Sequence, residues 1–422
     1  MNFICEIKRE MSTDVVVIGG GTAGVFAAIA AAKSGAKTIL IEKNSIPGGT
    51  MTVANVNFPG LFFAWGKQII NGPCWEAVER TINMGGGKMP EITFKPERHW
   101  HEQIRLNRFV FVSVLFQMCD EAGVKVICNS MISEIEENDN NLKLIITGKD
   151  GLFAITAKKA IDATGDANLV QIAGYEVEKS ELLQPATLQN HISGYDIANV
   201  SADEIKKKFY SADLPEHISA DNLMSYLRKQ KIDMHIRCGN ADTSAGKTEL
   251  DKKAFNQVLK VFRFYRNISG LENIEIDFVA EETGVRETNR IVGESTITAE
   301  DYINGVFYPD SVCYAFYPVD RHIMKGIEQV FHKENVVAKI PYSALIPNNS
   351  KHILCAGRCI SSDTYANSAV RVEATCMATG QAAGCAAALA AKNNQNVKLV
   401  SYSEICKALK AINAIVPQNI IK

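Results

Sequence analysis

The sequence has no run of about 18 consecutive apolar residues, the length that a membrane-spanning helix needs. Its first ten residues are polar and lack the apolar stretch of a signal peptide. It has no excess of positive charge either, because 45 lysines and arginines stand against 47 aspartates and glutamates. These absences argue against a membrane protein, a secreted protein and a nucleic-acid-binding protein.

The 11 cysteines form no CxxC pair, and their number is odd. Cys355 and Cys359 are nearest in sequence, but Gly357 and Arg358 lie between them in a predicted turn, which disfavours a redox disulfide. Scattered thiols are typical of a reducing compartment, so we expect a cytoplasmic protein. We expect no metal site.

The most informative pattern that is present begins with a strand and a glycine turn near the N-terminus. Residues 15–18 are an uninterrupted β-branched run, typical of a strand covered on both faces. Gly19, Gly21 and Gly24 follow with the spacing GxGxxG. In such a unit the first glycine makes a tight turn, the second lets backbone approach a pyrophosphate, and the third lets the helix pack on the strand. Met11 stands just before this strand, so we expect the first ten residues to be a disordered extension.

A helix and a second strand complete the unit. The helix opens near Thr22, and its positive end would face the phosphate. A strand over residues 38–41 is followed by Glu42, 18 residues after Gly24, where a carboxylate can accept the hydroxyl protons of a ribose. The order predicts a dinucleotide-binding βαβ unit, and a purely structural βαβ unit is the alternative.

Three later segments extend this prediction. Residues 46–51, IPGGTM, form a glycine turn at which backbone can approach a ligand. Residues 158–170 are a strand that runs into the turn ATGD. Residues 351–392 contain a strand, a Gly-Arg turn, a polar loop and a long alanine-rich helix. Ligands of open α/β sheets bind at the carboxyl ends of such strands.

Together with the blocks ETGVRETNRIVGE at 282–294 and AGRCISSDTYANSAVRVEATCMATGQAAG at 356–384, these segments resemble a known family. The resemblance is to FAD-dependent oxidoreductases of the glutathione-reductase-like fold, in the branch without a separate NAD(P)H domain, and it covers nearly the whole chain. It implies FAD rather than NAD as the cofactor. The FAD-binding residues implied are Gly19, Gly21, Thr22, Ala23, Gly24, Glu42, Lys43, Gly49, Thr50, Met51, Met131, Thr164, Gly165, Asp166, Gly357, Arg358, Arg371 and Val372.

The expected fold is α/β, with a Rossmann-like FAD-binding domain and a mixed α+β cap that holds the substrate. The FAD-binding domain is predicted to be discontinuous, from residues 1–60, 100–174 and 336–422. Residues 61–99 would be an insertion at the interface, and residues 175–335 would form the cap. In the resembling family the last long helix points its N-terminus at the flavin, and here that helix is expected to begin near Arg371 or Val372.

Four residues are candidates for catalysis. Arg286 is either functional or part of an ion-pair ladder, whereas Arg290 in the same block is more readily structural. His322 could be a general acid or base, with an ordinary surface histidine as the alternative. Tyr365 and Arg371 flank the expected flavin loop, and Arg371 could clamp a substrate carboxylate or hold a flavin oxygen.

The predicted function is FAD-dependent oxidoreduction, with hydride transfer between a small organic substrate and N5 of the flavin. One alternative is a fumarate-reductase-like reaction on a carboxylic acid. Another is a flavin-dependent lyase or hydrolase with no net redox change. A non-enzymatic flavin-binding or RNA-modification accessory role is disfavoured by the absence of a basic surface. The expected partner is a small molecule, and the sequence does not indicate the oligomeric state.

Overall fold

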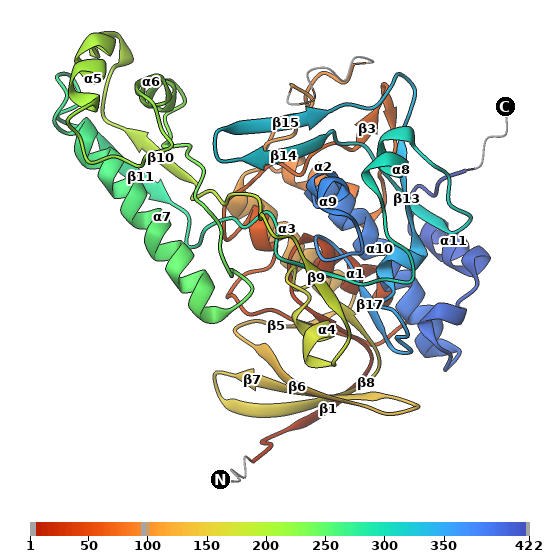
Figure 1. The fold of residues 1–422 in the computed structure, drawn as a ribbon. Coiled ribbons are helices and arrows are strands. Elements are labelled where there is room, and N and C mark those ends of the chain that lie inside the picture. The colour runs from red at the N-terminus through yellow and green to blue at the C-terminus, as the bar shows by residue number, and fades with distance from the viewer. Residues whose placement is uncertain (1–5, 94–98, 100, 419–422) are drawn as a thin grey trace.

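The computed structural model describes residues 6–93, 99 and 101–418 (Figure 1). Within these residues the main sheet has seven strands, in the order β5-β2-β1-β8-β7-β6, with β17 pairing along the C-terminal part of β8. The parallel strands are β1 Glu10–Ile18, β2 Thr38–Ile41, β5 Lys125–Ile127, β8 Gly151–Asp162 and β17 Ile353–Cys355. An antiparallel hairpin of β6 Met131–Glu137 and β7 Leu142–Gly148 extends the sheet beyond β8.

The predicted strand, helix and strand near the N-terminus are all present. Residues 15–18 are fully buried in β1, as their β-branched sequence requires. Helix α1 runs over Thr22–Lys33, and β2 has the predicted bounds. Strand β1, however, begins five residues earlier than the apolar run.

The predicted disorder of the first ten residues is wrong for residues 8–10. The backbone N–H of Lys8 donates to the carbonyl of Leu152, and Arg9 accepts from the N–H of Ala154. Glu10 pairs with Ala154 in the sheet. The long strand β8 pairs with this segment on the side opposite β7, and the pairing residues lie about 140 positions away in the sequence, out of reach of a local pattern. Residues 1–5 lie outside the described residues.

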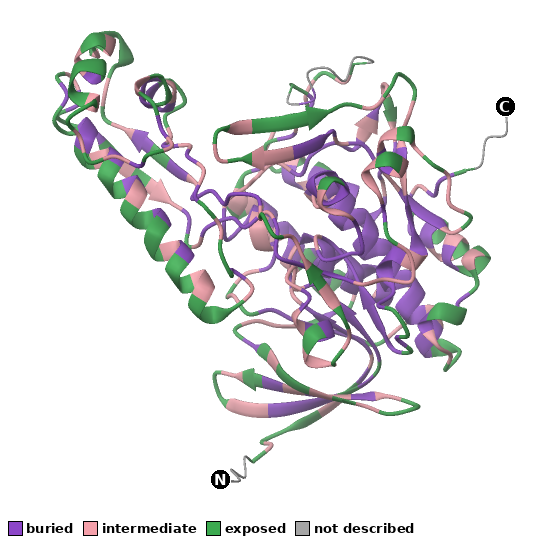
Figure 2. Cartoon of the chain, viewed as in Figure 1, coloured by how far each residue is buried: buried purple, intermediate pink, exposed green. Residues whose placement is uncertain are grey.

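Helix α10, Glu373–Lys392, packs directly on α1 and contacts strands β1 and β8 of the main sheet (Figure 1). A Cβ atom at Gly380 would lie 2.2 Å from the carbonyl oxygen of Ala23, and one at Gly384 would lie 2.2 Å from that of Ala27. The two glycines, one turn apart, therefore let the helix backbones approach closely. Figure 2 shows α10 buried along almost its whole length.

A second unit carries its own hydrophobic core, formed by buried residues between 186 and 285. It contains β10 Asn190–Ser193, α5 Ala202–Phe209, α6 Ala220–Arg228, α7 Ser244–Tyr265 and β11 Glu275–Val279. Figure 1 shows this unit beside the main body, and Figure 2 shows the exposed outer face of α7. This mixture of long helix and short antiparallel strands is the expected α+β cap.

The remaining elements pack against the main core. Buried residues of 291–346, such as Tyr302 and Phe316, belong to that core, as do Phe62 and Trp75 from the predicted insertion 61–99. The elements are β3 Phe63–Ala64, β4 Lys67–Gln68, α2 Pro73–Asn83, α3 Arg108–Glu121, α4 Asn168–Ile172, β9 Val177–Lys179, β12 Asn289–Ile291, α8 Ala299–Asn304, β13 Ser311–Ala315, β14 Val319–Ile323, β15 Gly326–Val330, β16 Ala338–Pro341, α9 Thr364–Val370 and α11 Tyr402–Ala411. Short 3-10 segments are η1 Gly49–Met51, η3 Ile197–Asn199, η4 Tyr342–Leu345 and η5 Val397–Leu399. The predicted domain boundaries stay a prediction. The second hydrophobic core is formed by residues between 186 and 285, whereas residues of 291–346 belong to the main core, so the two cores favour a cap narrower than the predicted 175–335.

Among the described residues, no helix combines the length and apolar character required to cross a membrane. Nor does that part of the chain bring three or more histidine, cysteine, aspartate or glutamate side chains together where they could hold a metal ion.

Candidate functional site

A cavity of about 550 Å³ lies where the main sheet meets the second unit. It is lined by the start of α1, the residues after β2, the turn after β8 and the start of α10. The opposite wall comes from residues 231–247, 282–286 and β14. The carboxyl ends of β1, β2 and β8 thus open into one space, as expected for a ligand site of an open α/β sheet.

The glycine turn at the start of α1 has the geometry that a phosphate group needs. A Cβ atom at Gly21 would meet only the carbonyl oxygen of Ala163, at 4.0 Å, so the empty position faces the cavity. Gly19 has φ +98°, which permits the tight turn, and a Cβ at Gly24 would lie 1.8 Å from the carbonyl oxygen of Gly19. Within the described residues no side chain caps α1, so its first N–H groups are open to an anion.

Glu42 lines the cavity and is almost fully buried. Its Oε2 accepts a hydrogen bond from the N–H of Gly20 at 2.6 Å, and its Oε1 accepts from the N–H of Asn44 at 2.7 Å. Burial raises the pKa of the carboxyl group, and these two N–H donors oppose the rise. The carboxylate therefore holds the glycine turn against β2, a role that the sequence did not indicate.

Most of the other predicted FAD-binding residues also line this cavity: Thr22, Ala23, Lys43, Gly49, Thr50, Met131, Thr164, Gly165, Asp166, Gly357, Arg358, Arg371 and Val372. Gly24 and Met51 do not line it. Gly24 packs against Gly19, and Met51 is buried in the main core. Their positions indicate packing roles beneath the site.

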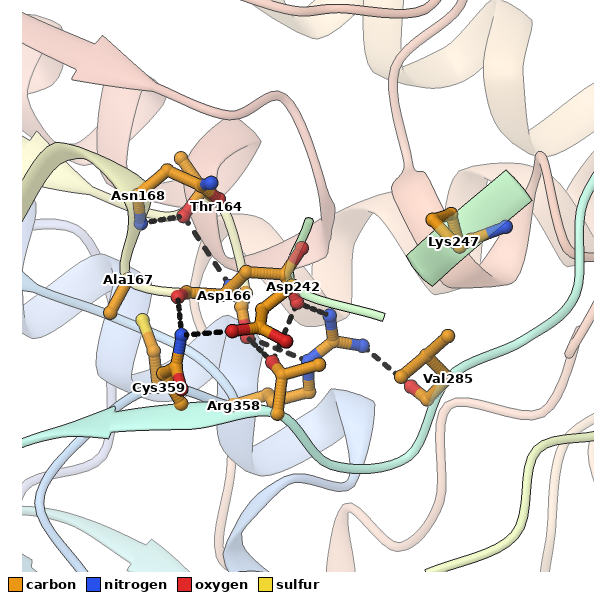
Figure 3. Close-up of polar contacts among 12 residues, drawn as sticks. Thr164, Asp166, Ala167, Asn168, Asp242, Lys247, Val285, Arg358 and Cys359 are labelled. Atoms are coloured by element: carbon orange, nitrogen blue, oxygen red, sulfur yellow. Dashed lines mark hydrogen bonds and ion pairs between the residues drawn. The ribbon is translucent and has the colours of Figure 1, made fainter. Parts of the chain in front are cut away.

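Arg358 and Asp166 tie the two walls of the cavity together (Figure 3). Nη2 of Arg358 donates to Oδ1 of Asp166 at 2.6 Å, and Nη1 donates to the carbonyl oxygen of Val285 at 2.5 Å. Oδ1 of Asp166 also accepts from the hydroxyl of Thr288 at 2.6 Å. The guanidinium group of Arg358 thus joins the ATGD turn after β8 to the ETGVRETNR block. These hydrogen bonds explain why an arginine stands in the Gly-Arg turn.

Replacing Asp166 with alanine should destabilise the protein by about 2 kcal/mol, because a partly buried guanidinium group loses its charged partner. The side chains of Asp166 and Arg358 are 20% and 17% exposed, which puts the expected effect at the lower end of the range for buried pairs. The measurement is the midpoint of thermal unfolding. Asp139→Ala is the control, because it removes an ion pair with Lys351 whose side chains are 89% and 59% exposed, and it should leave the midpoint unchanged. An unchanged midpoint for Asp166→Ala would show that the pair does not hold the turn.

Arg286 faces the same cavity without a carboxylate partner within ion-pair distance among the described residues. Its Nη1 donates to the carbonyl oxygen of Pro185 at 2.6 Å and to Oγ1 of Thr187 at 3.0 Å. Burial, and then the neighbouring Arg371, lower the pKa of the guanidinium group to about 9. The guanidinium group of Arg286 is therefore available to bind an anionic ligand in the cavity.

Arg371 lies at the C-terminal end of α9, two residues before α10 begins. Its Nη2 makes only long contacts, 3.3 Å to Oε1 of Gln184 and 3.4 Å to the carbonyl oxygen of Asp320. Its buried Nε has no hydrogen-bond partner within the described part of the chain. Arg371 and Arg286 therefore bring two cationic groups with unused donors to one cavity.

His322 lines the cavity from β14. Its backbone N–H donates to Oε1 of Gln184 at 3.2 Å, so the same amide oxygen contacts both His322 and Arg371. Its Nε2 lies 3.1 Å from Oδ2 of Asp320. Burial lowers the pKa of the imidazole to about 4; Arg286 and Arg371 add to this, and Asp320 opposes it. The ring is neutral at neutral pH and can act as a base.

The other polar candidates lie elsewhere. Tyr365 is 46% exposed, packs against the guanidinium group of Arg321 and does not line the cavity, so its position gives no support for catalysis. Arg290 is buried and pairs with Glu287 at 2.9 Å, the structural role that the sequence favoured. A further histidine that is not among the candidates, His191 on β10, pairs with Asp277 at 2.7 Å and does not line the cavity.

Among the cavity residues that sequence reasoning missed are three with carboxyl groups, Asp320, Glu373 and Asp233. Asp320 precedes His322 by two positions on β14, so strand alternation alone could have placed both side chains on one face. Glu373 stands in the first turn of α10, where burial raises the pKa of its carboxyl group to about 7. Asp233 comes from the second unit, and no local signal marks it.

The sheet, the glycine turn, the uncapped start of α1 and the cavity define a flavoprotein with a Rossmann-like FAD-binding domain and a cap. A family model described as FAD dependent oxidoreductase matches residues 14–409. The chain therefore belongs to the family of FAD-dependent oxidoreductases, and its cofactor is FAD.

Individual relatives match more weakly. The chain is 29% identical over 209 residues to digeranylgeranylglycerophospholipid reductase 1 of Methanosphaera stadtmanae, across 47% of this chain and 48% of the relative. It is 24% identical over 170 residues to thiamine thiazole synthase of Methanococcus vannielii, across 38% and 59%. The matches thus span about half the length of these curated relatives. A solved structure of a geranylgeranyl bacteriochlorophyll reductase-like protein from Thermoplasma acidophilum is similar at a TM-score of 0.44 and 16% identity, over 96% of this chain and 84% of that one.

Proposed function

We propose that the enzyme transfers a hydride between a small organic substrate and N5 of FAD, with Arg286, Arg371 and His322 forming the substrate end of the cavity. The observation that carries this proposal is that all three line the cavity that also contains the glycine turn of α1. FAD, when bound, supplies the hydride acceptor or donor. The pyrophosphate would lie on the N-terminal turn of α1, where Gly21 leaves room for it.

The two arginines favour a substrate with an anionic group. Each guanidinium group faces the cavity, and neither has a carboxylate within ion-pair distance among the residues that the structure describes. Bidentate binding of a carboxylate or phosphate would use their spare donors and orient the reacting carbon. The same observation keeps a reaction on a carboxylic acid, of the fumarate reductase kind, as the second candidate.

Two further groups would assist the reaction. The N-terminus of α10 opens into the cavity without a side-chain cap in the described residues, and its partial positive charge would stabilise negative charge that develops nearby. His322 would exchange the proton that accompanies the hydride.

We assign no catalytic role to Tyr365. We place the enzyme in the cytoplasm with a small-molecule partner, on the evidence of its cysteines and charge balance.

An anaerobic screen tests the proposal. FAD-bound protein is mixed with a panel of small alcohols, amines, hydroxy acids and other organic acids, and the flavin absorption band is followed. At least one compound with an anionic group should bleach the band, and the corresponding neutral amide or ester should not. Consumption of a compound without any bleaching during turnover would instead favour the lyase or hydrolase alternative. Bleaching by the neutral analogues at the same rate would contradict an anionic substrate.

A further inference from the structure

His322 contacts a second histidine that comes from the other unit of the molecule. Its Nδ1 lies 3.0 Å from Nε2 of His235, and the two rings meet edge to face. Nδ1 of His235 in turn lies 2.7 Å from the carbonyl oxygen of Ile323. With Asp320 at the far end, a chain of three polar contacts runs from the Ile323 carbonyl through His235 and His322 to Asp320.

The carbonyl at one end decides where the protons lie. A carbonyl oxygen can only accept, so Nδ1 of His235 carries a proton. Burial, followed by the charge of Arg286, lowers the pKa of His235, so the ring is neutral and its Nε2 has a lone pair. That lone pair must accept from Nδ1–H of His322. In neutral His322 the remaining nitrogen, Nε2, is then unprotonated.

This arrangement leaves one contact without a proton. Nε2 of His322 and Oδ2 of Asp320 are both acceptors, and their separation of 3.1 Å is the longest of the three. Oδ1 of Asp320 is already engaged by Nε2 of Gln329 at 2.6 Å. A proton that arrives at Nε2 of His322 would complete the missing hydrogen bond to Asp320.

The charged surroundings set how readily that proton is held. Arg286 and Arg371 face His322 and oppose its protonation, whereas Asp320 favours it. Near His235, Asp233 favours protonation and the ring of His217 opposes it. An anion bound to the two arginines would cancel their charge, so a bound substrate would make His322 a stronger base.

We propose that His235 is a positioning residue that fixes the tautomer of His322, so that Nε2 of His322 accepts the substrate's proton beside Asp320. This rests on the function proposed above and names the residue that prepares its base. In the oxidation of an alcohol or amine, FAD, when bound, would supply the acceptor for the hydride of the substrate C–H bond, and the O–H or N–H proton would pass to Nε2 of His322. A C=O or C=N bond forms, and the new imidazolium donates to Asp320. The reverse reaction returns the same proton.

The tautomer can be measured without any substrate. Nitrogen NMR of FAD-bound protein with isotope-labelled histidine distinguishes a protonated ring nitrogen from one with a lone pair, and His322→Gln assigns the signal. At neutral pH we expect a proton on Nδ1 of His322 and none on Nε2. A neutral wild-type ring with its proton on Nε2 would overturn the proposal.

Variants at His235 separate positioning from simple packing. In His235→Leu the acceptor for Nδ1–H is gone, so the proton should move to Nε2, where Asp320 accepts it. In His235→Gln an amide oxygen can replace the lost acceptor, and the wild-type tautomer should persist. His191→Leu removes a histidine paired with Asp277 on β10 and should leave the His322 signal unchanged. An unchanged tautomer in His235→Leu would contradict the proposal.

Kinetics supply the second readout. With a reductant from the anaerobic screen, His235→Leu should slow flavin reduction by on the order of tenfold to a hundredfold at unchanged FAD content, and His235→Gln should restore much of the rate. The apparent pKa of the rate should shift in His235→Leu only. An equal loss in both variants with no change in the pH profile would reduce His235 to a packing residue. If the screen finds no reductant, the proposed function fails, while the tautomer measurement still decides the role of His235.

Discussion

Gly21→Val should abolish FAD binding while the protein remains folded. A Cβ at this position meets only the carbonyl oxygen of Ala163, at 4.0 Å, so the protein itself tolerates the larger side chain. The added methyl groups would occupy the space in which we propose that the pyrophosphate lies against the N-terminus of α1. We expect FAD affinity to fall by roughly a hundredfold or more, which corresponds to about 2.7 kcal/mol. Equilibrium titration with FAD, with circular dichroism to verify folding, makes the measurement.

Two other glycines serve as comparisons for that substitution. Gly239 has open space around its Cβ position and does not line the cavity, so Gly239→Val should bind FAD normally. A Cβ at Gly24 would lie 1.8 Å from the carbonyl oxygen of Gly19, so Gly24→Val should fail to fold or fold poorly. Full FAD occupancy in Gly21→Val would mean that the cofactor does not use this turn.

Arg286→Met should slow flavin reduction by the true substrate by on the order of a hundredfold or more, equivalent to about 2 to 4 kcal/mol of transition-state stabilisation. FAD content should stay close to that of the wild type, because Arg286 belongs to the cap side of the cavity and not to the turn of α1. Single-turnover reduction under anaerobic conditions measures the rate. Arg263→Met, at an exposed position on α7, is the matched control and should have no effect.

The pH dependence provides a separate check on Arg286. Since burial and Arg371 lower the pKa of its guanidinium group to about 9, the group is cationic below this pH and loses its charge above it. The wild-type rate of reduction should therefore fall as the pH rises through about 9, and this fall should be absent in Arg286→Met. If Arg286→Met reduced the flavin as fast as the wild-type protein, Arg286 would have a structural role and not a catalytic one.

The sequence could predict the βαβ unit at the start of the chain because its determinants are contiguous. Strand, glycine turn, helix and acid occupy residues 14–43, and each depends on its close neighbours in the chain. Even there the prediction was incomplete. Glu42 binds the N–H groups of Gly20 and Asn44, and this became visible only when the two ends of the unit were placed side by side.

The role of Arg286 shows what local pattern could not determine. It stands in one block with Glu287 and Arg290, and the sequence favoured a structural role for Arg290 but left Arg286 open between function and an ion-pair ladder. In the folded chain Glu287 is buried and pairs with Arg290, while Arg286 turns to the cavity and meets Arg371 from a segment 85 positions later in the sequence. Tyr365 was a candidate for catalysis, but in the folded chain it is exposed beside Arg321. That position depends on how α9 packs on β14, which the sequence does not indicate.

The sequence by itself predicted the dinucleotide-binding βαβ unit of the Rossmann-like fold, because a turn that binds phosphate is specified by backbone conformation over a few adjacent residues. FAD rather than NAD followed from the resemblance of the whole chain to a known family. Only the tertiary structure decided which charged side chains face the cavity. Asp320, His322 and His235 meet across the boundary between two cores, and the burial that lowers the pKa of His322 exists only after those cores pack together. The proposed substrate end of the site is therefore a property of contacts between distant segments, and no single segment of the sequence predicts it.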